Sequence, residues 1–305
     1  MGIRRLTDLI VGLKGKRKYR VVGANAVDSH SLPALYRAVE MGLIEAIIIG
    51  DPEQFQDTCK NLNINPENFQ FLSETVDVRT VELAIKIILD RKADVVMKGL
   101  ISTDKFVGAL LNKEKGLVDP GGFLSHITIM EHPAYHKLLV ASDAAIVPHP
   151  DLNQKVKMIG NLIQLSSSLG VECPKVAVIA PTEQVLPGIE SCIDGAVLSK
   201  MYGRGQIKGG IVDGPLALDV AIDKEAAEMK GIRSEVAGNA DALLFPNLDA
   251  ANVFYKLSSK LAGAEFASLV VGAKAPVILS SRDDSVETKL FSIALGAWLA
   301  GKAEI

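Results

Sequence analysis

The residue types best suited to reaction chemistry gather near the carboxyl-terminal end of the chain. An apolar run at residues 276–279, predicted to be a strand, stops at residues 280–285, which read Ser-Ser-Arg-Asp-Asp-Ser, and a helix-period segment follows directly. In open α/β sheets, ligands bind beyond the carboxyl ends of strands, and the free N–H groups at a helix start favour anions. We therefore expect an anion-binding site built from hydroxyls, one guanidinium and carboxylates in this segment.

Part of the same segment also has a purely structural interpretation. Asp284 and Glu287 have the spacing of a capping box, although Asp replaces Ser or Thr at its head. A capping Asp stabilises its helix by about 1 kcal/mol and needs no ligand. The residues alone leave open whether Asp284 caps the helix or takes part in the site. In the same way, Arg282 either binds an anion or is an exposed side chain without a ligand.

The elements that must position these residues alternate along the chain. Short β-branched runs at residues 19–22, 46–49 and 93–97 are separated by helix-period segments, one of them at residues 78–91. This alternation predicts a doubly wound α/β architecture. The strand at 93–97 runs into a second polar loop, residues 98–103.

The second half of the chain repeats this rhythm. We expect strands at residues 138–140, 144–147 and 175–179, and a helix that Asp151 caps. Residues 252–262 predict a helix in which Val253, Leu257 and Leu261 recur at the spacing of an amphipathic helix. Residues 113–126, rich in glycine, proline and charge, are the clearest break in composition and predict a domain boundary near 119.

Composition narrows the class of protein. The 305 residues are 48% hydrophobic and 5% aromatic, which suits one large or two medium α/β domains. The formal net charge of -3, without a basic tail, makes nucleic acid an unexpected partner. Cys59, Cys173 and Cys192 form no C-x-x-C pair and resemble reduced thiols. No signal peptide and no apolar run of about 20 residues is present, so we expect a cytoplasmic protein without a membrane partner.

Two further patterns are weaker. His132 and His136 have the helical spacing of metal ligands, but Pro133 makes His132 a boundary residue, and we expect no metal site. The glycine-rich residues 203–210 match neither the dinucleotide-binding nor the P-loop spacing, so a tight loop is the expected structure.

Several motifs together resemble the phosphate acetyl/butyryltransferase family, and the butyryltransferase branch is the closer match. The main match is the segment 276–285 with the following Lys289-Leu290 and residues 292–295. Further matches, in chain order from about residue 95, are Lys98-Gly99 with Ser102-Thr103, Asp213-Gly214-Pro215-Leu216 with Asp219, residues 238–241, residues 246–248, and Asn252 with Tyr255-Lys256. The ordered set is far more specific than any single motif.

The resemblance implies a reaction and a fold. The family converts acyl-CoA and inorganic phosphate reversibly into acyl phosphate and CoA, so coenzyme A is expected as substrate and product, with no tightly bound cofactor. The fold is similar to that of isocitrate and isopropylmalate dehydrogenases, with two doubly wound α/β domains, an interdomain active-site cleft and a homodimer. On this basis we expect one domain at residues 1–118 plus 270–305 and the other at 119–269.

The resemblance also assigns catalytic roles. Arg282 binds phosphate or the oxyanion with its planar fork, and Ser281 donates a hydrogen bond to the oxyanion or to the leaving sulfur, in a ternary complex without an acyl-serine. The acetyltransferase branch has a carboxylate seven residues after this serine, where this chain has Thr288. Asp284 is therefore our expected base, with Asp283 as the alternative.

The remaining substrate-binding positions follow from the same match. The acetyltransferase branch has an arginine shortly after its Ser-Thr pair, and residues 104–108 contain none, so Lys98 or Lys105 is expected to supply the charge. Ser102 and Thr103 either bind phosphate at a helix start or cap that helix. The full set of expected substrate-binding residues is Lys98, Ser102, Thr103, Lys105, Asp213, Asp219, Asn252, Lys256 and Asp283.

Three other functions stay open on the sequence. A phosphate acetyltransferase differs only in the acyl group that it transfers. Each added methylene of that group contributes only about 1 kcal/mol of binding free energy, so the sequence does not separate the two activities. A metal- and NAD-dependent dehydrogenase of the same fold needs a carboxylate cluster, which the sequence does not display. A non-catalytic CoA-binding module is disfavoured because the chain has the length of a whole transacylase and an intact terminal motif.

Overall fold

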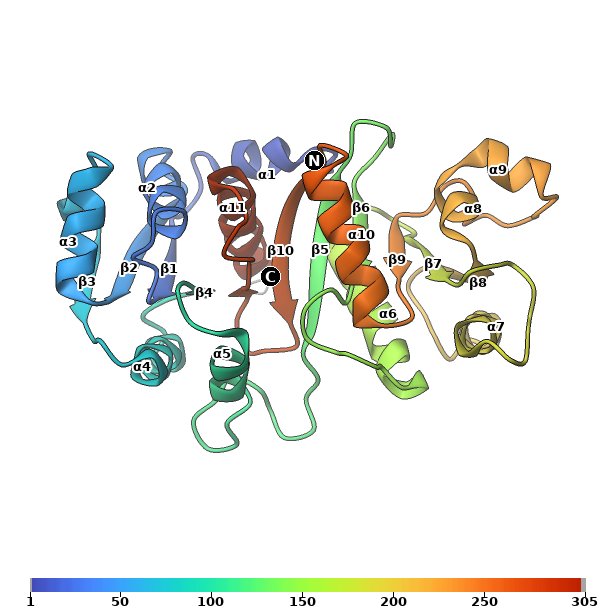
Figure 1. Ribbon diagram of the computed structural model, residues 1–305, viewed down its shortest axis with the longest axis horizontal. Coiled ribbons are helices and arrows are strands. Elements are labelled where there is room, and N and C mark those ends of the chain that lie inside the picture. Colours follow the sequence, from blue (N-terminus) through green and yellow to red (C-terminus); the bar gives the residue numbers. More distant parts are fainter. Residues whose placement is uncertain (1, 303–305) are drawn as a thin grey trace. The chain divides into compact units, whose positions relative to one another are not determined.

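The computed structural model describes residues 2–302, which form two compact units (Figure 1). Unit one contains residues 2–5 and 125–265, and unit two contains residues 6–124 and 266–302. The chain therefore enters each unit twice. Within residues 2–302, none of the helices combines the length and the apolar character that crossing a membrane requires.

The strands of unit two follow the order β3-β2-β1-β4-β11-β10. Its strands are β1 (Tyr19–Ala24), β2 (Ile44–Gly50), β3 (Gln70–Ser73), β4 (Val95–Lys98), β10 (Glu265–Val271) and β11 (Val277–Ile278). Its helices are α1 (Leu6–Leu13), α2 (Ser31–Glu40), α3 (Pro52–Asn61), the 3-10 turn η1 (Pro66–Asn68), α4 (Asp77–Leu89), α5 (Thr103–Leu110) and α11 (Val286–Lys302). The pairs are parallel except β10 with β11.

The strand order of unit two fixes where its helices lie. From β1 the chain moves outward to β2 and β3, and then returns past β1 to β4. Because such crossovers are right-handed, α2 and α4 cover opposite faces of the sheet. Helix α11 packs against α2 and α1, and α4 contacts β1, β2 and β4. The point between β1 and β4, where the order reverses, is the usual ligand position of a doubly wound sheet.

The core of unit two is aliphatic, as the composition predicts. Strands β1, β2 and β4 are buried along nearly their whole length, and helix α11 is buried on every side from Lys289 to Ala297. A helix that is apolar all round belongs in a protein interior. The helix that follows the polar segment is therefore a core element from Lys289 onward.

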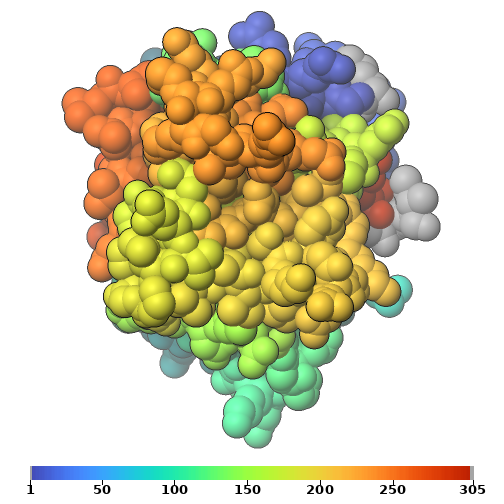
Figure 2. Space-filling view, turned by 90° about the vertical axis from the view of Figure 1, so that its right-hand side faces the viewer, coloured from blue at the N-terminus to red at the C-terminus, as the bar shows by residue number. Residues whose placement is uncertain are grey.

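The strands of unit one follow the order β5-β6-β9-β7-β8. Its strands are β5 (Ser125–Glu131), β6 (Leu139–Ser142), β7 (Lys175–Ile179), β8 (Ile211–Leu216) and β9 (Ala242–Leu244), and its helices are α6 (Leu152–Ser168), α7 (Glu190–Gly203), α8 (Leu218–Ile222), α9 (Lys224–Met229) and α10 (Leu248–Lys260). Only the β5–β6 pair is antiparallel. The segment from α7 to α9 forms most of the face in Figure 2. The two units confirm a mixed α/β fold.

One strand prediction in unit one is wrong. Residues 144–147 are not a strand, because the Asp143 carboxylate accepts the N–H groups of Ala145 and Ile146, both at 2.8 Å, and folds the segment into bends. By contrast, Asp151 caps α6 as predicted, in a capping box with Gln154.

Helix α10 exists but differs from the predicted helix. It begins at Leu248, a turn earlier than expected, since the Asn247 side chain accepts the N–H of Ala250. Its apolar row at Val253, Leu257 and Leu261 is 67%, 52% and 81% exposed, and its buried residues lie on another side of the helix. The row therefore faces away from the core of its own unit.

Candidate active site

Three loops of unit two meet at the carboxyl ends of β1, β4 and β11. Lys98 pairs with Ala24 of β1, and Ile278 of β11 pairs with Met97, so the ends of these parallel strands lie side by side. The charges of Asp28, in the loop after β1, and of Asp284, in the loop after β11, act on Lys98. The site therefore coincides with the reversal of strand order, where ligands of such sheets bind.

Gly99 allows two of these loops to touch. A Cβ atom at this position would lie 2.0 Å from the carbonyl oxygen of Asn25. The Gly99 and Leu100 N–H groups donate to the carbonyl oxygens of Ala24 (2.9 Å) and Asn25 (2.8 Å). This contact between backbones fixes the position of the residue just before the glycine, Lys98.

Lys98 is a buried cation at the end of β4. Its side chain is only 4% exposed, and its Nζ donates to the carbonyl oxygens of Gly99 (3.2 Å) and Ile101 (2.9 Å). Desolvation, with the nearby charges of Lys289 and Arg282, lowers the pKa of Lys98 to about 8, although Asp28 and Asp284 oppose the shift. Lys98 is thus a cation whose charge changes close to neutral pH.

The backbone and side chain of Ser281 are both held by the two aspartates that follow. The Ser281 N–H donates to Asp284 Oδ2 at 2.7 Å, and the Ser281 hydroxyl donates to Asp283 Oδ1. The Asp284 N–H donates back to the Ser281 carbonyl oxygen at 3.2 Å. Asp284 is buried and Asp283 is exposed, so only Asp283 combines contact with the hydroxyl and contact with solvent.

The helix cap is one residue later than the sequence suggests. The Ser285 hydroxyl accepts the N–H of Thr288 at 3.0 Å, and the Ser285 carbonyl accepts the N–H of Lys289 at 3.1 Å. Ser285 is therefore the N-cap of α11, and the proposal that Asp284 caps it is wrong. The Asp284 carboxylate instead binds the Ser281 loop.

Lys289 is the site residue that sequence reasoning missed. It is only 2% exposed, and its Nζ donates to the Ser280 hydroxyl at 3.0 Å and to the Ser281 carbonyl oxygen at 2.9 Å. Burial lowers its pKa, and the carboxylates of the site oppose this shift. A signal was present, because Lys289 lies three residues after Val286 and four before Ile293, both in the apolar pattern of the helix.

Arg282 has an exposed guanidinium in the middle of the site. It makes no hydrogen bond or ion pair with any of residues 2–302, yet its charge reaches Lys98 and helps to lower the pKa of that lysine. An exposed planar fork beside a buried cation can bind two oxygens of an anion.

The start of α5 holds the next group of predicted residues. Ser102 occupies the N-cap position without a capping hydrogen bond, and Thr103 begins the helix. The buried Ser102 hydroxyl has no hydrogen-bond partner within residues 2–302, and its nearness to the Asp104 carboxylate lowers the pKa of Asp104. The Nζ of Lys105 is bound to Asp77 Oδ2 at 3.1 Å, so a local ion pair already occupies this lysine.

Four predicted residues lie in unit one, where each contacts local partners. Asp213 accepts from Ser199 (3.2 Å) and from the Gly214 N–H (2.8 Å), and Asp219 forms an ion pair with Lys230 at 3.0 Å that lowers the pKa of Asp219. Asn252 donates to the Ala144 carbonyl oxygen at 3.0 Å, and the Lys256 ammonium lies 5.6 Å from the centre of the Tyr255 ring. Unit two thus gathers Lys98, Ser281, Arg282, Asp283 and Asp284. By contrast, Asp213, Asp219, Asn252 and Lys256 belong to unit one.

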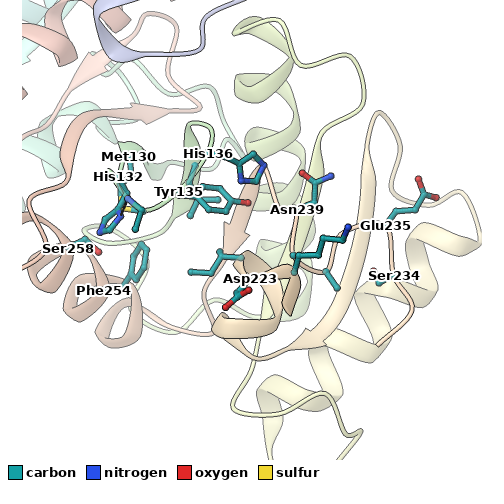
Figure 3. Close-up of a pocket in the computed structure, with 16 residues that line it drawn as sticks. Met130, His132, Tyr135, His136, Asp223, Ser234, Glu235, Asn239, Phe254 and Ser258 are labelled. Carbon is teal, nitrogen blue, oxygen red and sulfur yellow. Dashed lines mark hydrogen bonds between the residues drawn. The ribbon is translucent and has the colours of Figure 1, made fainter. Parts of the chain in front are cut away.

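Unit one also has a pocket of about 970 Å³ that none of the predicted residues lines (Figure 3). His132 and His136 border it, but they lie in the turns between β5 and β6, and the His132 Nδ1 accepts the Ala134 N–H at 3.0 Å. Tyr135 packs on the His136 ring, 4.7 Å between centroids. The two histidines therefore do not lie on a helix, although their spacing is helical. Within residues 2–302, no group of three or more side chains could hold a metal ion.

Comparison with known proteins places the chain among acyl-transferring enzymes. Residues 68–297 match the family model described as "Phosphate acetyl/butaryl transferase". The phosphate butyryltransferase of Clostridium acetobutylicum is 39% identical over 98% of this chain and 99% of its own length. The phosphate acetyltransferase of Thermotoga maritima is 39% identical over 98% of this chain and 100% of its own.

Solved structures agree with the sequence comparison. A branched-chain phosphotransacylase from Enterococcus faecalis superposes with a TM-score of 0.81 at 25% identity, covering 92% of this chain and 99% of that one. The likeness to a 4-hydroxythreonine-4-phosphate dehydrogenase from Klebsiella pneumoniae, with a TM-score of 0.57 at 12% identity and coverage of 93% and 100%, concerns the fold alone. The fold is that of a phosphotransacylase. The chain belongs to the phosphate acetyl/butyryltransferase family, which confirms the resemblance seen in its motifs.

Proposed function

We propose that this protein transfers a short-chain acyl group, butyryl or a similar group, from coenzyme A to inorganic phosphate, reversibly, and releases acyl phosphate and CoA. The observation that carries the proposal is the cluster at the end of β4 and β11, where the exposed Arg282 lies near the buried Lys98 and the hydroxyl of Ser281. The names of the full-length relatives support the same reaction.

The cluster supplies what this reaction needs. A phosphate oxygen attacks the thioester carbonyl carbon, the C–S bond breaks, and the CoA thiolate leaves and takes up a proton. Arg282 and Lys98 hold the phosphate, and one such contact is worth about 4 kcal/mol at an effective dielectric constant near 20, before desolvation. Ser281 donates a hydrogen bond to the developing oxyanion or to the sulfur, a contribution of about 3 to 4 kcal/mol in the transition state.

Direct transfer in a ternary complex is the mechanism we propose. Phosphate is itself the nucleophile, so holding it against the thioester supplies the proximity that an acyl-serine would otherwise provide. The hydroxyl of Ser281 is then needed only as a donor, and its present partner, Asp283, can orient it without removing its proton.

The proton acceptor in the reverse direction is one of two aspartates. The sequence names Asp284 first and Asp283 second. Geometry favours Asp283, because this carboxylate is exposed and contacts the Ser281 hydroxyl, whereas Asp284 is buried and bound to the Ser281 N–H. We propose Asp283 as the acceptor and Asp284 as the group that orients the loop.

Finer features of the family are part of the same proposal. They are the isocitrate dehydrogenase-like arrangement, domains at residues 1–118 plus 270–305 and 119–269, CoA as a substrate without another tightly bound cofactor, a cytoplasmic location, and substrate contacts from Ser102, Thr103, Lys105, Asp213, Asp219, Asn252 and Lys256. A homodimer is also proposed. The exposed apolar row of α10 supports a self-association surface, since apolar side chains grouped on a surface mark interfaces.

One assay tests the function. Thiol release from acetyl-, butyryl- and isobutyryl-CoA is measured with and without phosphate, together with the acyl phosphate formed. We expect release only with phosphate, one acyl phosphate per thiol, and faster turnover of the four-carbon substrates. Fastest turnover of acetyl-CoA would instead support the acetyltransferase alternative, for which the Thermotoga relative is the precedent.

Two variants connect the assay to the site. Ser281→Ala and Arg282→Ala are each expected to lower turnover by about 10²- to 10³-fold. Arg79→Ala removes an exposed arginine of α4 and serves as the control with unchanged turnover. Phosphate-independent thiol release, or full activity in both site variants, would refute the proposed function.

A further inference from the structure

Lys289 occupies a position that disfavours a lysine twice over. It lies in the first turn of α11, where the N-terminal end of the helix dipole repels cations, and its side chain is 2% exposed. Burial alone penalises an ammonium group. A lysine in such a place requires compensating contacts, and those contacts show what the residue does.

The hydrogen bonds of the Lys289 ammonium end on the loop that carries Ser281. Its Nζ donates to the Ser280 hydroxyl at 3.0 Å and to the Ser281 carbonyl oxygen at 2.9 Å. The carboxylates whose charges favour the ammonium form are Asp284, Asp28 and Asp283. Lys289 therefore connects a rigid, buried helix to the loop in which Ser281 lies.

Ser281 is held from three directions as a result. Asp284 accepts its N–H, Asp283 accepts its hydroxyl, and Lys289 binds its carbonyl oxygen. Of these three groups, only Lys289 lies within a helix, and α11 is buried from Lys289 to Trp298, so this contact ties Ser281 to the core of unit two.

We propose that Lys289 is a positioning residue for the acyl-transfer reaction, which holds the Ser281 loop in its productive geometry through the Ser280 hydroxyl and the Ser281 carbonyl. The inference rests on the proposed function, because it assigns Lys289 to the same site. Lys289 acts through Ser281 and makes no contact with the reacting atoms in this scheme.

Lys289→Met tests the proposal, since methionine keeps the length and apolar stem of lysine and removes the ammonium. We expect kcat to fall by about 100-fold, the effect of displacing a reacting group by about 1 Å, while KM for phosphate and for acyl-CoA changes by less than about threefold. Lys289→Arg restores a charged donor and should retain at least about tenfold more activity than the methionine variant.

Lys155→Met is the matched control. Lys155 is also a buried lysine on a helix, with a side chain that is 4% exposed and paired with Asp194, but it lies in α6 of unit one. Loss of this pair is expected to lower the thermal midpoint and to leave kcat unchanged. A fall of kcat in Lys155→Met equal to that in Lys289→Met would show a general effect of lost buried charge and would overturn the proposal.

Ser280→Ala gives a second test that does not depend on how well Lys289→Met folds. It removes one of the two acceptors of Lys289, so kcat should fall by about three- to tenfold, and the double variant should be no slower than Lys289→Met alone. Unchanged kcat in Ser280→Ala and in the folded Lys289 variants overturns the positioning role. Absence of phosphate-dependent thiol release in the wild-type protein is a different result, because it refutes the proposed function itself.

Discussion

The chemistry at Ser281 depends on which carboxylate meets its hydroxyl. Adjacent aspartates could exchange roles in the sequence, but in the structure they have different partners: Asp283 faces the hydroxyl, and Asp284 faces the backbone N–H. A buried carboxylate that accepts a backbone N–H is a structural anchor, whereas an exposed carboxylate on a hydroxyl can receive a proton.

Replacement of each aspartate by asparagine separates these roles. Asp283→Asn should lower the rate of CoA acylation by acyl phosphate by about 10²- to 10⁴-fold with little change in thermal midpoint, because the base is lost and the loop is kept. Asp284→Asn should lower the thermal midpoint, because the buried ammonium of Lys289 loses a neighbouring negative charge. Rates and thermal unfolding are measured on both variants. The reverse pattern, with the larger rate loss and an unchanged midpoint in Asp284→Asn, would return the base to Asp284.

The pKa of Lys98 predicts how activity varies with pH. Since this pKa is about 8, Lys98 loses its charge, and phosphate loses a binding partner, as the pH rises through that value. We expect kcat/KM for phosphate to fall above about pH 8 in the wild-type protein and to stay high in Lys98→Arg, because arginine keeps its charge. A profile from about pH 6 to about pH 10 checks this. The same descending limb in both proteins would assign the titration to another group.

The stability contribution of Lys98 has the opposite dependence on pH. Below about pH 8 the lysine is charged in the folded and unfolded states, so the penalty for burying the charge is fully present. Between about 8 and the ordinary lysine pKa of 10.5, the unfolded chain binds more protons than the folded one. The contribution of Lys98 to folding stability therefore rises with pH across this window, while phosphate binding weakens.

Among the elements, the contact between the loops after β1 and β4 gives the site its shape. It depends on the missing side chain of Gly99, because the Asn25 carbonyl oxygen that a side chain would meet is part of a rigid backbone and cannot move aside cheaply. Asn25 itself has a left-handed backbone with φ of 51° and donates from its side chain to Asp77 at 3.3 Å.

Gly99→Ala is expected to destabilise the protein by about 1 to 3 kcal/mol and to reduce kcat/KM for phosphate, because the added methyl group pushes the loops apart and moves Lys98. Gly108→Ala is the control on α5, where no atom lies within 4 Å of the added carbon, and should stabilise the helix by up to about 1 kcal/mol. Denaturant unfolding and the phosphate dependence of turnover measure both effects. A Gly99→Ala variant as stable and active as the wild type would contradict the close approach.

For the whole molecule, much of the fold was predictable because alternating strands and helices leave strong periodic signals. The α/β class, the helix now defined as α4 and the Asp151 cap depend on local sequence and were predicted correctly. Positions set by tertiary contacts were not. The apolar row of α10 was read from its spacing alone, which shows that one side of a helix is apolar but not what that side faces.

The site divides in the same way. The motif at residues 280–285 and the lysine at 98 could be found from residue types and from the resemblance, and unit two brings them together. Three features could not be predicted from the sequence: the cap at Ser285, the contact of Asp283 with the Ser281 hydroxyl, and the role of Lys289. Each depends on the direction in which a side chain points at one loop. Periodicity assigns residues to faces and does not resolve that choice.

The interrupted path of the chain through unit two has a consequence for its biosynthesis. The strand β11 lies between β4 and β10, yet it follows the whole of residues 125–265. While the ribosome makes that insertion, β4 is an edge strand with unpaired backbone groups, a feature that invites association with other chains. Residues 125–265 of unit one are complete before β11 is made, so they can fold first. Ser281 and Lys289 join Lys98 only after unit two receives β11 and α11, so the reactive centre is assembled after residues 125–265 have been made.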